Sequence, residues 1–329
     1  MQNIFITGPT GGVGRMAIQM ATSRGAHVTA MGRDTAALAS MASSRVHTYM
    51  AELAQVPEEF LRRAMSGHDA VWHCAGLVAE DGSAEALHVA NVVIAERAFQ
   101  AAGKARVPVF VHVSSPALYF GFKALTNIPE SYDPGIYATE YARSKVEAEH
   151  KLLSLARDFP DTKLVVLRPR ALYGPYDRVF MPKLIQYLKS CKGTIYLPEG
   201  GAAVLDLCYQ GNLAHAMWLA SHNKNLASGS IFNITDSGPV RVSEIFNTVA
   251  AHLGLELSIR RVPYFVLKAY LSMAGRLGIQ DKTAAMRNLQ LLSQLTFDTT
   301  LSIQRARTYL SYEPLFPVNE AVKLTLKSF

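Results

Sequence analysis

The sequence predicts an α/β fold, a doubly wound parallel sheet with a smaller, intertwined C-terminal lobe. Short β-rich runs alternate with helix-like stretches through the first half of the chain. This alternation is typical of βαβ units, which build a parallel sheet covered on both faces. A glycine-rich string follows the first run, and 329 residues with 49% hydrophobic and 18% charged content are enough for a large core.

The expected elements can be placed in chain order. Strands are expected at 3–7, 27–31, 69–74, 108–114 and 163–168, with helices between them that include 12–24, 83–103 and 137–157. After about residue 170 the alternation loosens and turn signals such as YGPYD, PEGG and DSGP multiply. We therefore expect one domain over 1–170 and a second lobe mainly over 171–329, some segments of which return to the first domain.

Composition argues against several classes of protein. Lys and Arg exceed Asp and Glu by seven (33 against 26), which suits an anionic ligand, but no basic run indicates a nucleic-acid-binding arm. Cys74, Cys191 and Cys208 have no metal-like spacing and are interpreted as reduced thiols of a cytoplasmic chain. The N-terminus has no signal-peptide pattern, and no uncharged apolar run approaches the roughly 18–20 residues of a membrane span.

A phosphate-binding loop is expected in FITGPTGGVGR, directly after the first strand. Gly8, Gly11 and Gly14 stand at the spacing that allows a tight turn, a close approach of pyrophosphate to the backbone, and close packing of the following helix on the sheet. Free N–H groups at the helix start then bind the phosphate. The string predicts a Rossmann-type dinucleotide site over the first domain.

The end of the second strand, AMGRD, bears on the choice of cofactor. An acidic residue at this place would bind the ribose hydroxyls of NAD, but Gly32 occupies it and Arg33 follows. Because a guanidinium pairs well with phosphate, NADP(H) is favoured and NAD(H) remains the alternative. Arg33 could equally be a solvated loop residue, and the neighbouring Asp34 weakens the case for NADP(H).

Three Tyr–Lys pairs have the spacing of one helical turn: Tyr119–Lys123, Tyr141–Lys145 and Tyr264–Lys268. The first contains Gly121 and follows a strand, which disfavours a helix. The tyrosine of the third belongs to an apolar face. Only Tyr141–Lys145 begins a strong helix whose N-terminal part should reach the carboxyl edge of the sheet, where ligands of such folds bind.

A hydroxyl at the same edge strengthens this choice. Ser114 and Ser115 end the strand in FVHVSSPALY. Lys145 as a cation would lower the pKa of Tyr141, so that the phenol could exchange a proton with a carbonyl or alcohol oxygen near neutral pH. Ser115 would hydrogen-bond the same oxygen, and a nicotinamide would supply the hydride.

With these residues in place, the chain resembles the extended short-chain dehydrogenase/reductase family over nearly its whole length. The phosphate loop, VWHCAG, ANVV, VSSPALY, YARSK, LRPRALYGPYDR and LDLCYQGNLAHA occur in the order of that family. The resemblance implies that Ser115 is the catalytic hydroxyl and that Tyr141 is the acid/base. It also implies that Lys145 is the electrostatic partner of Tyr141 and binds the nicotinamide ribose, and that Asn91 supports the active site.

The resemblance also implies the cofactor contacts. The implied cofactor-binding residues are Gly8, Thr10, Gly11, Gly12, Val13, Gly14, Arg33, Glu52, Leu53, Ala75, Tyr141 and Lys145. Glu52 stands where the family usually has an Asp near the adenine. Gly12 departs from the family pattern, which commonly has an aromatic residue there. No metal site is expected.

Two positions direct the resemblance toward one branch. Nucleotide-sugar epimerases and dehydratases usually have Asn where this chain has Ala171, and Arg where it has Leu205. The pattern is closer to the 3β-hydroxysteroid dehydrogenase-like branch, which includes bacterial 2-alkyl-3-oxoalkanoate reductases. This implies a ketone or secondary alcohol on an apolar, steroid-like or long-chain 3-oxo acid substrate. A nucleotide-sugar epimerase/dehydratase and a non-catalytic NADP-sensing protein are the alternatives.

Two surfaces are singled out. Residues 262–279 and 284–297 are apolar at helical spacing, with Arg260, Arg261, Lys268 and Arg276 interspersed. This pattern fits a core face, a lid over an apolar substrate, or a membrane-contacting helix within 260–280. By resemblance, the helices at 83–103 and 137–157 form the interface of a homodimer.

Overall fold

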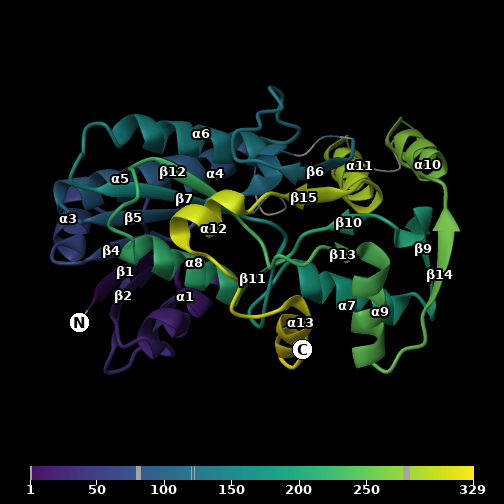
Figure 1. Cartoon of the computed structure of the whole chain (residues 1–329), viewed down its shortest axis with the longest axis horizontal. Helices are drawn as coiled ribbons and strands as arrows, with labels where there is room; N and C mark the ends of the chain where they lie inside the picture. Colours follow the sequence, from purple (N-terminus) through teal and green to yellow (C-terminus); the bar gives the residue numbers. More distant parts are fainter. Residues whose placement is uncertain (1, 79–82, 120, 122, 277–281) are drawn as a thin grey trace.

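The computed structural model describes residues 2–78, 83–119, 121, 123–276 and 282–329, with the side chains of 275, 276, 282–287 and 290 excepted. A seven-stranded parallel sheet fills the half of the molecule that contains the N-terminus, in the order β12-β7-β5-β4-β1-β2-β3 (Figure 1). Its strands are β1 (Asn3–Thr7), β2 (His27–Gly32), β3 (Val46–Met50), β4 (Ala70–His73), β5 (Val109–Val113), β7 (Lys163–Pro169) and β12 (Ser230–Ile234). The predicted Rossmann-type sheet is confirmed, and β3 and β12 are strands that the sequence pattern did not reveal.

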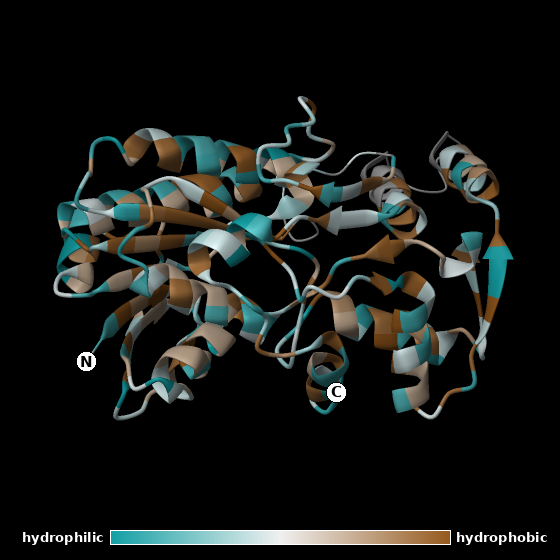
Figure 2. Cartoon of the chain, viewed as in Figure 1, coloured by the Kyte–Doolittle hydropathy of each residue, from teal (hydrophilic) through white to brown (hydrophobic). Residues whose placement is uncertain are grey.

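Helices cover both faces of this sheet. On one face lie α1 (Gly12–Ser23), α8 (Gln210–His222) and α12 (Gln304–Leu310), and on the other α3 (Glu58–Met65), α5 (Ile94–Lys104) and α6 (Glu140–Leu155). Each layer buries its own apolar cluster, and hydrophobic residues run along the strands between the layers (Figure 2). Because both faces are covered, the strands read as continuous apolar runs and not as alternating ones.

The helix expected at 83–103 is built from three pieces. These are α4 (Ala84–His88), a single π-helical turn η1 (Val89–Val93), and α5. A π-turn inserts a residue into the helix, and such turns are frequent at functional sites. Here the π-turn carries Asn91, whose side chain is buried.

The second lobe has its own core and three small sheets. The four-stranded sheet has the order β13-β10-β15-β6, and β11-β8 and β14-β9 are pairs. Their bounds are β6 (Leu125–Ile128), β8 (Leu172–Tyr173), β9 (Thr194–Pro198), β10 (Val204–Leu205), β11 (Cys208–Tyr209), β13 (Val240–Arg241), β14 (Ser258–Val262) and β15 (Thr299–Leu301). The chain crosses between lobes in both directions, since β6 joins the small sheet while β12 and α8 belong to the layers of the large one.

The remaining helices complete the two lobes. They are α2 (Thr35–Ala39), η2 (Pro116–Tyr119), α7 (Phe180–Ser190), η3 (Glu199–Gly201), α9 (Val242–His252), α10 (Tyr264–Arg276), α11 (Lys282–Thr296) and α13 (Val318–Leu326). In the part of the chain that the structure describes, none of the helices has the length and apolar character that crossing a membrane requires.

Candidate active site

The glycine-rich loop between β1 and α1 has the shape of a phosphate cradle. Gly8 has a φ of +66°, and a Cβ there would lie 2.7 Å from the Cα of Ala75. A Cβ at Gly14 would lie 2.2 Å from the carbonyl oxygen of Gly8. Gly11 is the N-cap of α1 and is exposed, with no side chain to satisfy the first N–H groups of the helix. These features fit the pyrophosphate of a dinucleotide.

The structure gives a physical reason for glycine at position 12. A Cβ there would meet the Nε2 of Gln210 at 2.4 Å and the carbonyl oxygen of Tyr176 at 2.8 Å. The side chain of Gln210, from the start of α8, thus occupies the space that an aromatic residue at position 12 would need. Gly12 departs from the family pattern because the packing around it leaves no room for a side chain.

The residues expected near the adenine ribose are found together at the ends of β2 and β3. Arg33 Nη1 lies 3.4 Å from Glu52 Oε2, and the Arg33 side chain is 76% exposed. An ion pair this exposed is weak, so Arg33 stays available to an anionic ligand. Leu53, which follows Glu52, has its side chain buried in the core, so a contact with the cofactor would be made by its backbone.

Three more of the expected cofactor residues lie along the loop. Val13 packs against the core beneath α1, and Ala75 faces Gly8. The Thr10 carbonyl oxygen lies 3.4 Å from both Arg15 Nε and Arg178 Nη2, which donate to it. Two cations therefore flank the phosphate loop, one from α1 and one from the second lobe.

The structure places Ser115 and Tyr141 in contact at the carboxyl edge of the sheet. Ser115 follows β5, and Tyr141 lies in the first turn of α6, where the Thr139 side chain caps the helix by accepting from Ala142 N at 3.1 Å. The Ser115 hydroxyl acts on the phenol of Tyr141 in the direction that lowers its pKa. The serine hydroxyl and the phenol thus lie near each other, where the end of β5 meets the start of α6.

Lys145 lies one helical turn after Tyr141, buried beneath this edge. Its Nζ donates to the carbonyl oxygen of Val113, the last residue of β5, at 3.2 Å. Burial lowers the pKa of Lys145 to about 8, and the nearby Glu149 and Cys74 oppose this shift. Lys145 is therefore a cation at neutral pH that loses its proton more readily than an exposed lysine.

The expected effect of Lys145 on Tyr141 is not found. Burial raises the pKa of the Tyr141 phenol, and the hydrogen bond with Ser115 opposes that rise only in part. The prediction that Lys145 lowers this pKa is wrong for this structure. The ammonium is directed to the Val113 carbonyl, and removal of the phenol from water outweighs the other effects.

Asn91 links the π-turn to the helix that carries the Tyr–Lys pair. Its Oδ1 accepts from Leu77 N at 2.8 Å, and its Nδ2 donates to Leu77 O at 3.1 Å and to Ser144 Oγ at 3.0 Å. A Cβ at Gly76 would lie 3.0 Å from the Asn91 Oδ1 and 3.3 Å from the Lys145 Nζ. Asn91 therefore holds α6 in position at Ser144, directly before Lys145.

The other two Tyr–Lys pairs lie in different surroundings. The Tyr119 hydroxyl is buried, donates to Asn233 Oδ1 at 3.0 Å and accepts from Arg168, and burial raises its pKa to about 12. Tyr264 begins α10 in the second lobe, with its ring edge-on to Phe297 at 5.1 Å and Lys268 Nζ 5.7 Å from its centroid. Within the described residues, no hydrogen bond joins either pair to Ser115.

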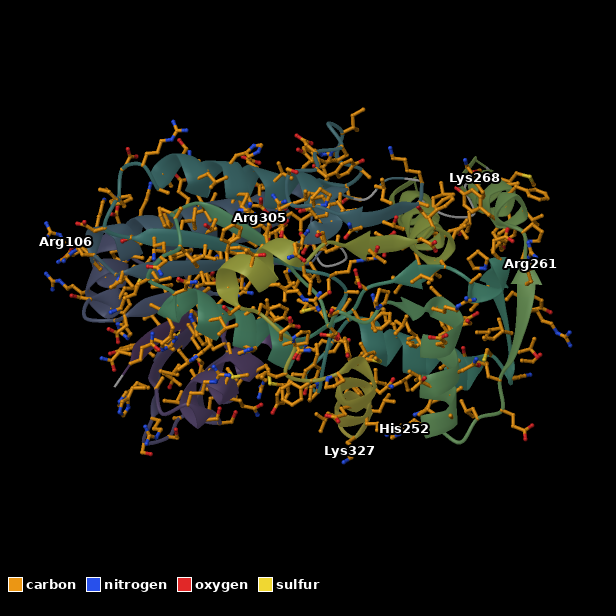
Figure 3. All side chains as sticks on the ribbon, viewed as in Figure 1. Arg106, His252, Arg261, Lys268, Arg305 and Lys327 are labelled. Atoms are coloured by element: carbon orange, nitrogen blue, oxygen red, sulfur yellow. The ribbon has the colours of Figure 1, made fainter. Side chains whose placement is uncertain are left out.

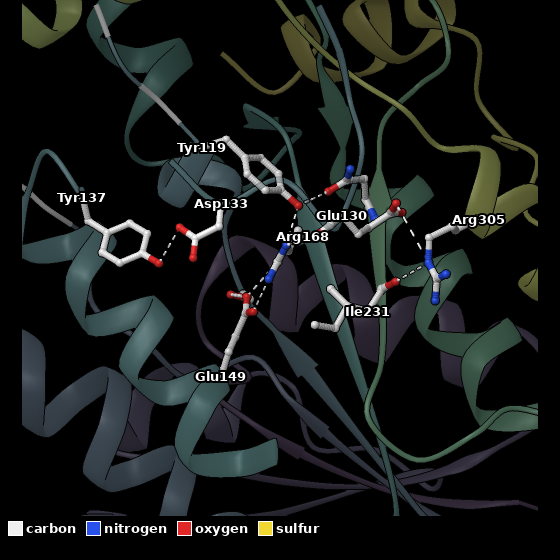
Figure 4. A network of polar contacts seen from close by, with 10 residues as sticks. Tyr119, Glu130, Asp133, Tyr137, Glu149, Arg168, Ile231 and Arg305 are labelled. Atoms are coloured by element: carbon white, nitrogen blue, oxygen red, sulfur yellow. Dashed lines mark hydrogen bonds and ion pairs between the residues drawn. The ribbon is translucent and has the colours of Figure 1, made fainter. Parts of the chain in front are cut away.

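A buried ion pair below the site was not predicted from the sequence (Figure 4). Glu149, one turn after Lys145, accepts from Arg168 Nε at 3.0 Å and Nη2 at 2.5 Å, and from Ser114 Oγ at 2.5 Å. Arg168 also donates to the Tyr119 hydroxyl and to Glu130 O at 3.0 Å. The position of Glu149 four residues after Lys145 on the same helix face was the available signal.

Two histidines beside the site are core residues, as expected. His73 Nδ1 shares a 2.8 Å hydrogen bond with Thr7 Oγ1, and its ring stacks on His112 at 5.4 Å. Burial lowers the pKa of His73 to about 3, so its imidazole is neutral. Within the described residues, no group of three or more His, Cys, Asp or Glu side chains could hold a metal ion.

The chain is similar to known proteins of one family. The model of the NAD dependent epimerase/dehydratase family matches residues 4–235. The uncharacterized protein YbjS of Escherichia coli is 33% identical over 98% of this chain and 96% of its own length. A 4-hydroxy-2-methyl-3-oxo-4-farnesyl-3,4-dihydroquinoline-1-oxide ketoreductase of Stigmatella aurantiaca is 27% identical, covering 94% of this chain and 91% of that protein.

A further relative and a solved structure extend the comparison. A 2-alkyl-3-oxoalkanoate reductase of Shewanella oneidensis is 25% identical over 98% of this chain and 85% of its own length. The crystal structure of UDP-glucuronic acid 4-epimerase from Bacillus cereus in complex with NAD superposes with a TM-score of 0.76 at 18% identity, covering 99% of this chain and 96% of that one. At that identity the likeness shows the fold.

Proposed function

Because the chain belongs to the NAD dependent epimerase/dehydratase family, we propose that it interconverts a ketone and a secondary alcohol on an apolar molecule with NADP(H). Reductases and dehydrogenases among its relatives make it an oxidoreductase of the short-chain dehydrogenase/reductase type. The observation that carries the proposal is that the Ser115 hydroxyl acts on the phenol of Tyr141, one helical turn before Lys145.

Tyr141 is the proposed proton carrier. Burial raises the pKa of Tyr141, so its hydroxyl is protonated at neutral pH and can give the proton to a carbonyl oxygen. Ser115 hydrogen-bonds the same oxygen. Lys145, whose ammonium is held at the Val113 carbonyl, is the proposed partner of the nicotinamide ribose. When bound, the nicotinamide cofactor supplies the hydride-transfer chemistry.

The phosphate loop and Arg33 are the proposed cofactor-binding groups. The close approach at Gly8 and Gly14 and the open N-terminus of α1 fit a dinucleotide. Arg33 supports a preference for NADP(H), because its guanidinium is exposed and bound only weakly by Glu52. Glu52 can equally accept from ribose hydroxyls, which keeps NAD(H) as the alternative cofactor.

An apolar substrate is supported by two positions in the second lobe. Leu205 is buried in β10, and Ala171, with a φ of 46°, has no polar side chain. Neither can bind the diphosphate of a nucleotide sugar. The names of two relatives, a ketoreductase of a farnesylated quinoline oxide and a 2-alkyl-3-oxoalkanoate reductase, agree with a ketone on an apolar chain or ring.

A screen of ketones with the purified protein tests the proposal. Long-chain 3-oxo acids, 3-oxosteroids and UDP-sugars are each incubated with NADPH or NADH while the absorbance of the reduced cofactor is followed. Reduction that increases with apolar chain length is expected. Conversion of a UDP-sugar without net cofactor change would indicate an epimerase, and NADPH binding without turnover of any compound would indicate a sensor.

We also propose a homodimer formed through α4, α5 and α6. The exposed positions of α6 are largely polar and include Arg143, Glu147, His150 and Lys151. Lys151 pairs with Glu96 of α5 at 3.4 Å. Such an interface would be held largely by charged contacts, so it should weaken as salt is added.

A further inference from the structure

The outward face of α10 is apolar. Phe265 is 70% exposed, Val266 44%, Tyr270 65% and Met273 58%. Steps of one, four and three residues separate them along the chain, so all four side chains lie on one side of the helix. A contiguous group of large apolar side chains this exposed marks a contact surface more often than an ordinary monomer surface.

This face lies at the end of the molecule away from the large sheet. Figure 1 shows α10 above the tip of β14 and next to α11, at the opposite end from α3. The inner side of α10 packs on α11 and buries Ala274, so the helix is anchored while its outer side is free of other described elements. Arg276 and residues 277–280 of the expected contact segment lie outside the described side chains and residues.

The charged residues within the segment that carries this face are all basic. The segment 257–280 contains Arg260, Arg261, Lys268 and Arg276 and no Asp or Glu. Arg260 and Lys268 are exposed, and Figure 3 places Lys268 and Arg261 at the same end of the molecule. Arg261 is bound by Glu199 at 2.6 Å, so the net positive charge comes from the others. An anionic surface complements this arrangement.

We propose that α10 docks the protein on the surface of a bilayer containing anionic lipids. Phe265, Val266, Tyr270 and Met273 enter the boundary between headgroups and acyl chains, and the surrounding cations contact the headgroups. The 13 residues of α10 span about 20 Å, too short for a hydrocarbon core of about 30 Å, so the helix lies in the plane of the surface.

A second copy of the chain fits this face less well. A twofold contact through α10 would bring Arg260 and Lys268 of one chain toward the same cations of the other. With no acidic residue in 257–280 to oppose them, that contact would be repulsive. A lipid surface supplies the negative charge that a second copy lacks.

Docking gives the proposed reaction access to its substrate, and this part of the inference rests on the proposed function. A long-chain or steroid-like ketone partitions into the bilayer, where its concentration far exceeds that in water. A protein held at the bilayer surface by α10 is therefore close to substrate that is dissolved in the bilayer. The binding itself requires no turnover and can be measured separately.

The test is flotation of the full chain with vesicles of two compositions. Vesicles of equal parts phosphatidylglycerol and phosphatidylcholine should bind the protein, and pure phosphatidylcholine vesicles should bind it more weakly. The double variant Phe265→Ser/Tyr270→Ser should reduce binding at least about tenfold, because two exposed rings no longer enter the interface. Lys268→Gln should weaken binding to the anionic vesicles only.

A matched control separates docking from general surface change. Tyr309→Ser removes a ring that is 54% exposed but lies on α12, which packs on the large sheet. It should bind anionic vesicles like the unaltered protein. All these positions are exposed, and unchanged thermal unfolding would show that the variants are folded.

Three results would overturn the inference. They are equal binding of the double variant and the unaltered protein, no binding to anionic vesicles, and a lipid-free dimer that the same double substitution dissociates. The last result would assign the face to a second copy. Vesicle binding with no ketone turnover would leave the docking in place and contradict the proposed function alone.

Discussion

Replacement of Tyr141 by Phe tests the centre of the proposed mechanism. The change removes one oxygen and leaves a ring that still fills its half-buried place in the first turn of α6. Loss of the interaction with the Ser115 hydroxyl should reduce stability by at most about 0.5–1.5 kcal/mol. Loss of the general acid should lower kcat for ketone reduction by roughly 10²- to 10⁴-fold.

The structure also predicts the pH dependence of the unaltered protein. Burial raises the pKa of Tyr141, so the phenol is protonated throughout the neutral range. The pKa of Lys145 is about 8, lowered by burial from its usual value, so the ammonium is present below that pH and lost above it. Since kcat/KM reports the free protein, kcat/KM for reduction should be flat near neutrality and fall as pH rises past about 8.

The matched controls are Phe at the other two tyrosines. In Tyr119→Phe, the buried side chains of Asn233 and Arg168 each lose one hydrogen bond, which should reduce stability by about 1–3 kcal/mol. Its kcat, and that of Tyr264→Phe, should stay within about tenfold of the unaltered protein. Stopped-flow measurement of reduced cofactor at saturating ketone gives kcat for each. Near-normal kcat in Tyr141→Phe, with a collapse in either control, would refute the assignment.

Further predictions concern Arg33, Glu149 and the proposed dimer. Arg33→Ala should remove most of a preference for NADPH over NADH, on the order of 1–3 kcal/mol for a charge-assisted contact, and equal affinities in the unaltered protein by calorimetry would contradict it. Glu149→Gln leaves the Arg168 guanidinium buried without its carboxylate, so thermal and denaturant unfolding should show a loss of roughly 3–5 kcal/mol. Glu149 raises the pKa of Lys145 against the effect of burial, so the same variant should lower that pKa. The alkaline fall of kcat/KM should then begin at a lower pH. A fall at the same pH would show that the Glu149 charge does not act on Lys145. Light scattering should give a dimer mass that declines as salt is added, and a monomer at micromolar concentration would exclude the proposed interface.

The strands that the sequence predicted are the ones buried on both faces. β1, β4 and β5 are continuous apolar runs because helices cover them on each side. β3 was missed because it is the edge strand of the sheet, with Tyr49 and Met50 exposed. β12 was missed because it returns to the sheet from the second lobe, and no local pattern encodes its pairing with β7.

The site divides in the same way. A motif places Tyr141 and Lys145 on one helix turn, so their proximity can be read from spacing alone. The pairing of Glu149 with Arg168 joins α6 to the end of β7, and spacing within one segment cannot predict it. The direction of the Tyr141 pKa was predicted wrongly for a related reason: burial is a property of the assembled fold, and here it outweighs the groups nearby in sequence.

The buried ion pair also bears on which serine faces the proposed reaction. The sequence offers Ser114 and Ser115 at the end of β5. Ser114 Oγ donates to Glu149 at 2.5 Å, and the Glu149 carboxylate is fixed in turn by Arg168. Ser114 is thereby committed to the buried network, while the hydroxyl of Ser115 is left to meet Tyr141. Because Glu149 also supports the charge of Lys145, one carboxylate both holds Ser114 and maintains the cation that is proposed to bind the nicotinamide ribose.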